Sequence, residues 1–189
     1  GAACQVLCRR AFRAAPDHSA VRRQTPGGAL TSTKSSLGLV GWLVISFAAG
    51  WIGSQYMPGA WYATLTKPAW NPPSSVFGPV WTVLYVLMAV AAWLVWRRAG
   101  FTGGGLTLPL FLAQLVLNAL WSYLFFGIHR PDLAFLEIVV LSAVILWVTL
   151  LFWRKVPLAG VLMLPYLAWV GFASCLNFAL WQLNRGPTA

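Results

Sequence analysis

The amino-acid sequence predicts an all-α integral membrane protein, folded as a bundle of five transmembrane helices. Hydrophobic residues make up 59% of the 189 positions and charged residues only 8%, whereas soluble domains carry about 25% charged residues. Five apolar stretches are long enough to cross a bilayer, which takes about 20 helical residues. Because lipid offers no hydrogen-bond partners, each stretch must satisfy its own backbone polar groups, and a helix does so.

The ends of the five stretches carry consistent signals. Arg97 and Arg98 precede a glycine-rich run after the second stretch, and Arg130 and Asp132 flank a proline between the third and the fourth. A basic pair that begins at Arg154 ends the fourth. The expected spans are, in order, Leu37–Met57, Val76–Trp96, Leu106–Ile128, Leu133–Trp153 and Leu158–Leu180.

The basic residues near the span ends predict the orientation. The side of a membrane protein that is richer in Lys and Arg faces the cytosol. The amino-terminal side is the richer one here, so we expect the amino terminus in the cytosol. The long proline-rich loop after the first span and the carboxyl terminus are then on the opposite side. The amino-terminal side carries Lys34, Arg97, Arg98, Arg154 and Lys155, and the other side carries Lys67, Arg130 and Arg185.

Residues 1–36 differ from the rest of the chain. They hold six basic residues against Asp17 alone, with Ser, Thr, Gly and Pro toward their end. This composition resembles that of an organelle transit peptide, but an unstructured basic tail or translated upstream sequence is favoured over it. The membrane domain is expected to cover residues 37–185, followed by a short carboxyl-terminal tail at 186–189.

Several classes of function are disfavoured. Beyond residue 36 the basic residues stand singly or in pairs at span ends, which is the pattern of interfacial anchors and not of a nucleic-acid-binding patch. No His lies within a span, and Cys4, Cys8 and Cys175 form no metal-ligand set, so no metal site or cofactor is expected. Glu137, the charged residue inside a span, is placed about one turn from the entrance, where it is expected to reach headgroup water.

Amide and aromatic side chains gather on one face of each of three spans. Amides are costly in a bilayer unless they are bonded, so these faces must look at protein or at a cavity. The two interpretations are helix packing with the amides bonded across the interface, or a lined pocket. The faces are Gln114, Asn118, Trp121 and Phe125 in the third span, Tyr166, Trp169, Ala173 and Asn177 in the fifth, and Trp81, Tyr85 and Met88 in the second.

The first span has a stripe of small residues instead. Ser46, Gly50 and Ser54 recur every four residues, with Ala49 and Gly53 alongside. Small residues at this spacing let helices approach closely, which favours packing over ligand contact. The stripe is also one reason to expect a homodimer.

Three longer motifs resemble one family. The segments "WYATLTKPAWNPPSSVFGPVWTVLY" (Trp61 to Tyr85), "QLVLNALWSYLFFGIHR" (Gln114 to Arg130) and "LPYLAWVGFASCLNFALWQLNR" (Leu164 to Arg185) look like the TspO/MBR family of tryptophan-rich sensory and translocator proteins. The resemblance covers about residues 37–185. It implies a five-helix membrane protein, often a homodimer, that binds porphyrins and related hydrophobic ligands and is linked to tetrapyrrole transport, regulation or breakdown.

The resemblance also implies particular site residues. A loop that covers the ligand and three of the helices would supply them, and Trp81 and Trp169 match the two tryptophans implicated in porphyrin breakdown by bacterial members. With Tyr85 from the face described above, the expected ligand-binding residues are Tyr62, Trp70, Pro72, Trp81, Tyr85, Gln114, Asn118, Trp121, Trp169 and Ala173.

Cholesterol, a ligand of animal members, is not favoured. The sterol-recognition pattern of those members needs a Tyr followed closely by Lys or Arg. Phe178 occupies the Tyr position in this sequence, and Arg185 lies too far along.

The sequence is therefore interpreted as a membrane receptor or transporter for tetrapyrroles of the protoporphyrin type. A flat macrocycle would stack on Trp81, Trp121 and Trp169, with its propionates near indole N–H groups, amides or Lys67. Two alternatives stay open: an enzyme that degrades porphyrin oxidatively in light, with Trp81 and Trp169 as its catalytic residues, and a membrane scaffold. The type of membrane, bacterial envelope or organelle, is left open.

Overall fold

The computed structural model describes residues 32–101 and 105–186, and regular structure in these ranges is helical without strands. Five helices are long and apolar enough to span a membrane, as predicted. Each begins and ends within a few residues of its expected bounds. The helices are α2 (Ser32–Ser54), α4 (Ser74–Ala99), α5 (Thr107–Ser122) with its π-helical continuation η2 (Tyr123–Gly127), α6 (Pro131–Lys155) and α7 (Pro157–Leu183). The sequence did not predict the short helix α3 (Ala60–Thr64), which lies in the loop between α2 and α4.

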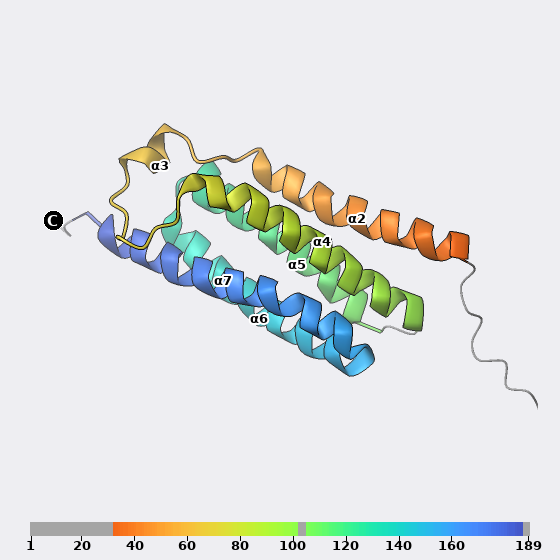
Figure 1. Ribbon diagram of the computed structural model, residues 1–189. Helices are drawn as coiled ribbons and strands as arrows, with labels where there is room; N and C mark the ends of the chain where they lie inside the picture. Colours follow the sequence, from red (N-terminus) through yellow and green to blue (C-terminus); the bar gives the residue numbers. More distant parts are fainter. Residues whose placement is uncertain (1–31, 102–104, 187–189) are drawn as a thin grey trace, which may run out of the picture. The chain divides into compact units, whose positions relative to one another are not determined.

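The five long helices run up and down (Figure 1), and their contacts form a closed ring. The main contacts join α2 to α4, α4 to α7, α7 to α6, α6 to α5 and α5 back to α2. The basic residues predicted to end the spans lie in the last turns of α4 and α6, where cations stabilise the helix dipole. A single residue, Val156, connects α6 to α7, and Pro157 begins α7.

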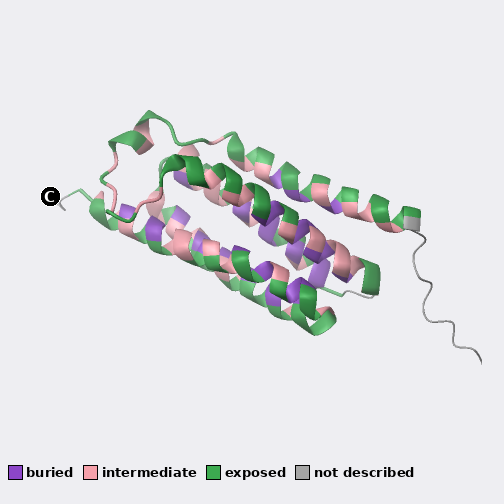
Figure 2. Cartoon of the chain, in the orientation of Figure 1, coloured by how far each residue is buried: buried purple, intermediate pink, exposed green. Residues whose placement is uncertain are grey.

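The core lies inside the ring, and the outer faces are apolar and exposed. Buried positions follow one stripe of each long helix in Figure 2. Met88, Phe111, Ile145, Phe152 and Met163 have no exposed surface. The rings of Phe111 and Phe152 stack with centroids 5.7 Å apart, which fastens α5 to α6. Exposed apolar side chains on the outer surface suit a lipid solvent.

The small-residue stripe of α2 packs against neighbouring helices of the same chain. Ser46 is fully buried. A Cβ atom added at Gly50 would lie 2.5 Å from the Tyr85 ring, and one added at Gly53 would lie 3.2 Å from the Ser122 hydroxyl. The stripe thus permits the close approach of α2 to α4 and α5, as expected for packing. The homodimer stays a prediction.

We expect Gly50→Ala to destabilise the bundle, by about 1–3 kcal/mol, a typical cost of overpacking. The added methyl group would push the Tyr85 ring, whose hydroxyl is fixed by a hydrogen bond to Asn118. Gly41→Ala is the matched control. Gly41 lies on the same helix, and a Cβ atom added there would meet nothing within 4 Å. The measurement is the thermal unfolding midpoint in detergent. Equal midpoints for the two variants would contradict this view of the α2 stripe.

Candidate ligand-binding site

A small cavity of about 40 Å³ lies toward the end of the bundle where α3 is found. Seven of its eleven lining residues are aromatic, and they come from α3, α4, α5, η2 and α7. We call it the inner cavity. It brings together residues far apart in the sequence, because the ring of helices closes around it. The lining residues are Tyr62, Phe77, Trp121, Phe125, Phe126, Trp169, Phe172, Ala173, Leu176, Asn177 and Leu180.

Aromatic stacking and one amide fix the wall of the inner cavity. Trp121 stacks on Phe125 with centroids 5.2 Å apart. Its indole N–H donates to Oδ1 of Asn177 at 3.0 Å, and Nδ2 of Asn177 donates to the Pro131 carbonyl at 2.8 Å. Asn177 therefore joins α5, the first residue of α6 and α7 beside the cavity. On the opposite side, Trp169 contacts the rings of Phe77 and Phe172 at 5.9 and 5.6 Å.

Residues 55–73, which include α3 and which we call the lid, are held together by polar contacts. The Tyr62 hydroxyl donates to Oδ1 of Asn71 at 3.1 Å. Burial raises the pKa of the Tyr62 hydroxyl above its ordinary value, and the bond to Asn71 offsets this in part, so the phenol stays neutral. The Lys67 ammonium donates to the carbonyls of Ala63 and Leu65 and lies 4.8 Å from the centre of the Tyr62 ring.

A pair of hydrogen bonds and a ring stack are among the contacts that fasten the lid to the bundle. Asn184, just after α7, donates from Nδ2 to the Thr66 carbonyl and accepts the Thr66 N–H at Oδ1, both at 2.9 Å. Trp61 stacks on His129 with centroids 4.3 Å apart. His129 has a φ of 57°, which is uncommon for a residue other than glycine. The lid is therefore closed over the inner cavity by specific bonds as well as by apolar packing.

A second group of predicted site residues lies in a buried network and lines no described cavity. The Tyr85 hydroxyl donates to Oδ1 of Asn118 at 2.8 Å, and Nδ2 of Asn118 donates to the Tyr166 hydroxyl at 3.3 Å. Nε2 of Gln114 lies 3.8 Å from the Met88 sulfur. In this structure these side chains bond α4, α5 and α7 to each other, which matches the packing interpretation of their faces.

The ten predicted ligand-binding residues thus fall into three sets. Trp70 is half-exposed, and its ring packs on Phe172 at 5.7 Å from the lid side. Trp81 is partly buried and stacks on Tyr85 at 5.4 Å. The sets are the inner cavity (Tyr62, Trp121, Trp169, Ala173), the lid (Trp70, Pro72) and the buried network (Trp81, Tyr85, Gln114, Asn118).

Sequence reasoning did not select several residues of the site. Phe172, Leu176 and Leu180 line the cavity from the same side of α7 as Trp169 and Ala173, and helical spacing from Trp169 could have identified them. No signal in the sequence pointed to Asn184 or His129. Their partners in the lid, Thr66 and Trp61, are distant in the chain.

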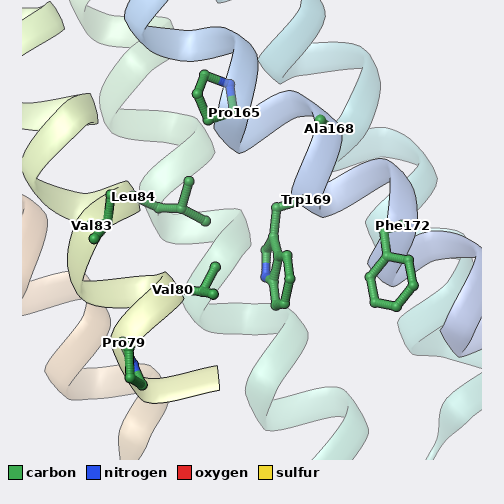
Figure 3. Close-up of a pocket in the computed structure, with 8 residues that line it drawn as sticks. All are labelled: Pro79, Val80, Val83, Leu84, Pro165, Ala168, Trp169 and Phe172. Carbon is green, nitrogen blue, oxygen red and sulfur yellow. The ribbon is translucent and has the colours of Figure 1, made fainter. Parts of the chain in front are cut away.

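A larger groove of about 520 Å³ lies between α4 and α7 (Figure 3). We call it the groove. Trp169 and Phe172 line both the groove and the inner cavity. The eight lining residues are Pro79, Val80, Val83, Leu84, Pro165, Ala168, Trp169 and Phe172.

The expectation that Glu137 reaches headgroup water is wrong. Both of its carboxylate oxygens are buried, with no hydrogen-bond partner in the described part of the chain. Glu137 is the seventh residue of α6, and its carboxyl group is enclosed within the packed helices. Cys175, by contrast, is exposed on α7. Within residues 32–101 and 105–186, no three His, Cys, Asp or Glu side chains come together as a metal site would need.

Comparisons with known proteins agree with the resemblance noted in the sequence. The model of the TspO/MBR family matches residues 39–182. The translocator protein of Ovis aries is 38% identical over 153 residues, covering 78% of this chain and 90% of that protein. The tryptophan-rich protein TspO of Archaeoglobus fulgidus is 41% identical over 143 residues, covering 75% and 91%. Protein CrtK of Rhodobacter capsulatus is 38% identical over 149 residues, covering 77% and 91%.

We expect Asn184→Ala to loosen the lid without unfolding the bundle. The change removes two hydrogen bonds to Thr66, each worth about 0.5–1.5 kcal/mol. Amide hydrogen exchange in residues 55–73 should then become several-fold faster, with the core of the helices unaffected. Gln182→Ala is the control, because Gln182 lies at the same end of α7 and, in the described part of the chain, accepts a side-chain hydrogen bond from Arg185 and makes none to the lid. Unchanged amide exchange in the lid of the Asn184 variant would mean that the bonds between Asn184 and Thr66 do not hold the lid in place.

Replacement of Glu137 by Gln should raise the thermal unfolding midpoint by a few degrees. The amide keeps the shape of the side chain and cannot ionise, so the cost of burying an unpaired charge, which exceeds that of burying an unpaired amide, is removed. The midpoint is measured in detergent at neutral pH, with Asp132→Asn as the comparison. Asp132 is paired with Arg130 at 2.7 Å on the surface, so its amide variant should gain nothing. A lower midpoint for Glu137→Gln would show that the carboxylate has a bonding partner.

Proposed function

The chain belongs to the TspO/MBR family of multi-pass membrane proteins, and we propose that it binds tetrapyrroles of the protoporphyrin type in the inner cavity. The observation that carries this proposal is the density of aromatic rings around that cavity, closed by the lid. Other flat hydrophobic molecules would meet the same rings. The role that follows is that of a membrane receptor or transporter for such ligands.

The chemistry of the wall suits a flat π-system with acidic side arms. Trp121 and Trp169 offer indole faces from α5 and α7, and aromatic side chains of this size bury about 150–250 Å² each. The neutral Tyr62 hydroxyl and the Asn177 amide are polar groups at the same cavity. Lys67 is close to Tyr62 and could exchange its carbonyl partners for a propionate, a stronger, charge-assisted bond.

The closed state leaves too little room for such a ligand. Pockets for drug-sized molecules have volumes of about 300–1,000 Å³, whereas the inner cavity has about 40 Å³. Side chains that line the cavity must therefore move when a ligand enters. A site of this kind encloses its ligand and shields it from water.

The test is a titration of the purified full chain in nanodiscs with protoporphyrin, followed by quenching of tryptophan fluorescence in the dark. Ala173→Leu adds bulk inside the inner cavity and should weaken binding about tenfold, equivalent to about 1.4 kcal/mol. Cys175→Leu places the same side chain on the exposed side of α7 and should bind like the wild type.

Two results would count against the proposal. One is wild-type protein that does not bind protoporphyrin, and the other is equal affinity in the two leucine variants when both retain the wild-type unfolding midpoint. A parallel series in light measures porphyrin absorbance. Loss of porphyrin that depends on the protein and is abolished by Trp169→Phe would favour the photo-oxidative enzyme over the receptor.

A further inference from the structure

The groove and the inner cavity are separated by two side chains. Trp169 and Phe172 line both spaces, and their rings are 5.6 Å apart between centroids. Figure 3 shows the Trp169 indole between the α4 side chains of the groove and the Phe172 ring on α7. The two spaces would join if these rings turned aside.

We propose that the groove between α4 and α7 is a lateral entrance, through which flat aromatic molecules dissolved in the bilayer reach the inner cavity. Trp169 and Phe172 form the gate. For porphyrins this rests on the function proposed above, but the entrance itself is a property of the fold and can be tested with another flat molecule.

The chemistry of the groove selects its occupant. Its eight lining side chains are apolar apart from the indole N–H of Trp169, and α4 and α7 are membrane spans. Val83, on the α4 wall of the groove, is 57% exposed. In a membrane, this face is therefore covered by lipid acyl chains and by hydrophobic molecules dissolved among them. A flat aromatic molecule partitions into that layer and meets proline, valine and indole surfaces without losing any hydrogen bond.

The gate is held only by ring packing, whereas the lid is held by bonds. Trp169 contacts the rings of Phe77 and Phe172, and its side chain has no hydrogen bond within residues 32–101 and 105–186. A route under the lid would instead have to break the pair of bonds between Asn184 and Thr66, and the Trp61 stack on His129 as well. The lateral route is therefore the one with the weaker barrier.

Prolines on both walls favour local movement of the same two helices. Pro79 of α4 and Pro165 of α7 face the groove from opposite sides (Figure 3). Each lacks the N–H that would bond the carbonyl four residues earlier, Ser75 or Val161. Helices bend most readily at such positions. Separation of α4 from α7 along the groove would widen the gate.

The test uses a thiol placed inside the inner cavity. Ala173→Cys is made in the full chain, with Cys4, Cys8 and Cys175 replaced by serine, and reconstituted in liposomes. Pyrenyl maleimide, a flat probe that dissolves in the bilayer, is added, and the rate of its attachment is followed by pyrene fluorescence. A charged, membrane-impermeant maleimide reports access from water.

Val83→Trp, which fills the groove, should slow pyrene labelling about tenfold. Val86→Trp is the matched control, because it places the same bulk on the same helix at another exposed valine outside the groove. Ala168→Trp fills the groove from the α7 wall and should act like Val83→Trp, which covers the case in which one variant does not fold. Phe172→Ala removes one ring of the gate and should speed labelling.

Equal labelling rates in the Val83 and Val86 variants would overturn the entrance, and would leave the groove as a seat for an acyl chain only. Faster labelling in Asn184→Ala, with no effect of Val83→Trp, would place the route under the lid and would equally overturn the proposal. If labelling follows the expected pattern while wild-type protein fails to bind protoporphyrin, the entrance stands and the proposed ligand is wrong.

Discussion

The bilayer offers no water to the polar groups of this chain, and the bundle depends on how two asparagines meet that constraint. Asn118 accepts from Tyr85 and donates to Tyr166, so that one amide of α5 bonds to α4 and α7. Asn177 does the same between α5 and the start of α6. Ring packing alone would let the helices slide, because lipid is as apolar as their outer faces. The amides fix their register.

The two asparagines also divide the bundle by depth. Around Asn118, and from there toward the end of the bundle opposite the lid, large apolar side chains such as Met88 and Phe111 are fully buried. Near Asn177 the aromatic rings leave a small cavity below the lid. The polar network therefore lies below the inner cavity, on the side away from the lid and from the gate residues Trp169 and Phe172. Separating these parts allows the site to change shape while the bundle keeps its stability.

The sequence was sufficient for the five spans and for the faces that look inward, because hydrophobic length and helical spacing depend on local residues alone. It was insufficient to tell which inward-facing side chains pack in the core and which line the cavity. Spacing places Trp81, Tyr85 and Asn118 on inner faces, but only the packed structure shows that Tyr85 donates a hydrogen bond to Asn118 and that Trp81 stacks on Tyr85, whereas Trp121 lines a cavity. Glu137 was misplaced for the same reason: its distance from the helix end was visible, and the neighbours that enclose it were not. The Asn184 clamp joins positions 118 residues apart, beyond any local signal.

The π-helical segment η2 has a consequence for how this chain tolerates change in length. The N–H of Ile128 bonds to the Tyr123 carbonyl five residues earlier, so this turn contains one residue more than an α-helical turn would. The wider turn lets two consecutive residues, Phe125 and Phe126, both face the inner cavity. Deleting one residue here would restore an α-helical repeat and turn one phenyl ring outward. It would also rotate His129 away from Trp61. The number of residues in this turn therefore determines both the shape of the cavity wall and the ring stack that holds the lid.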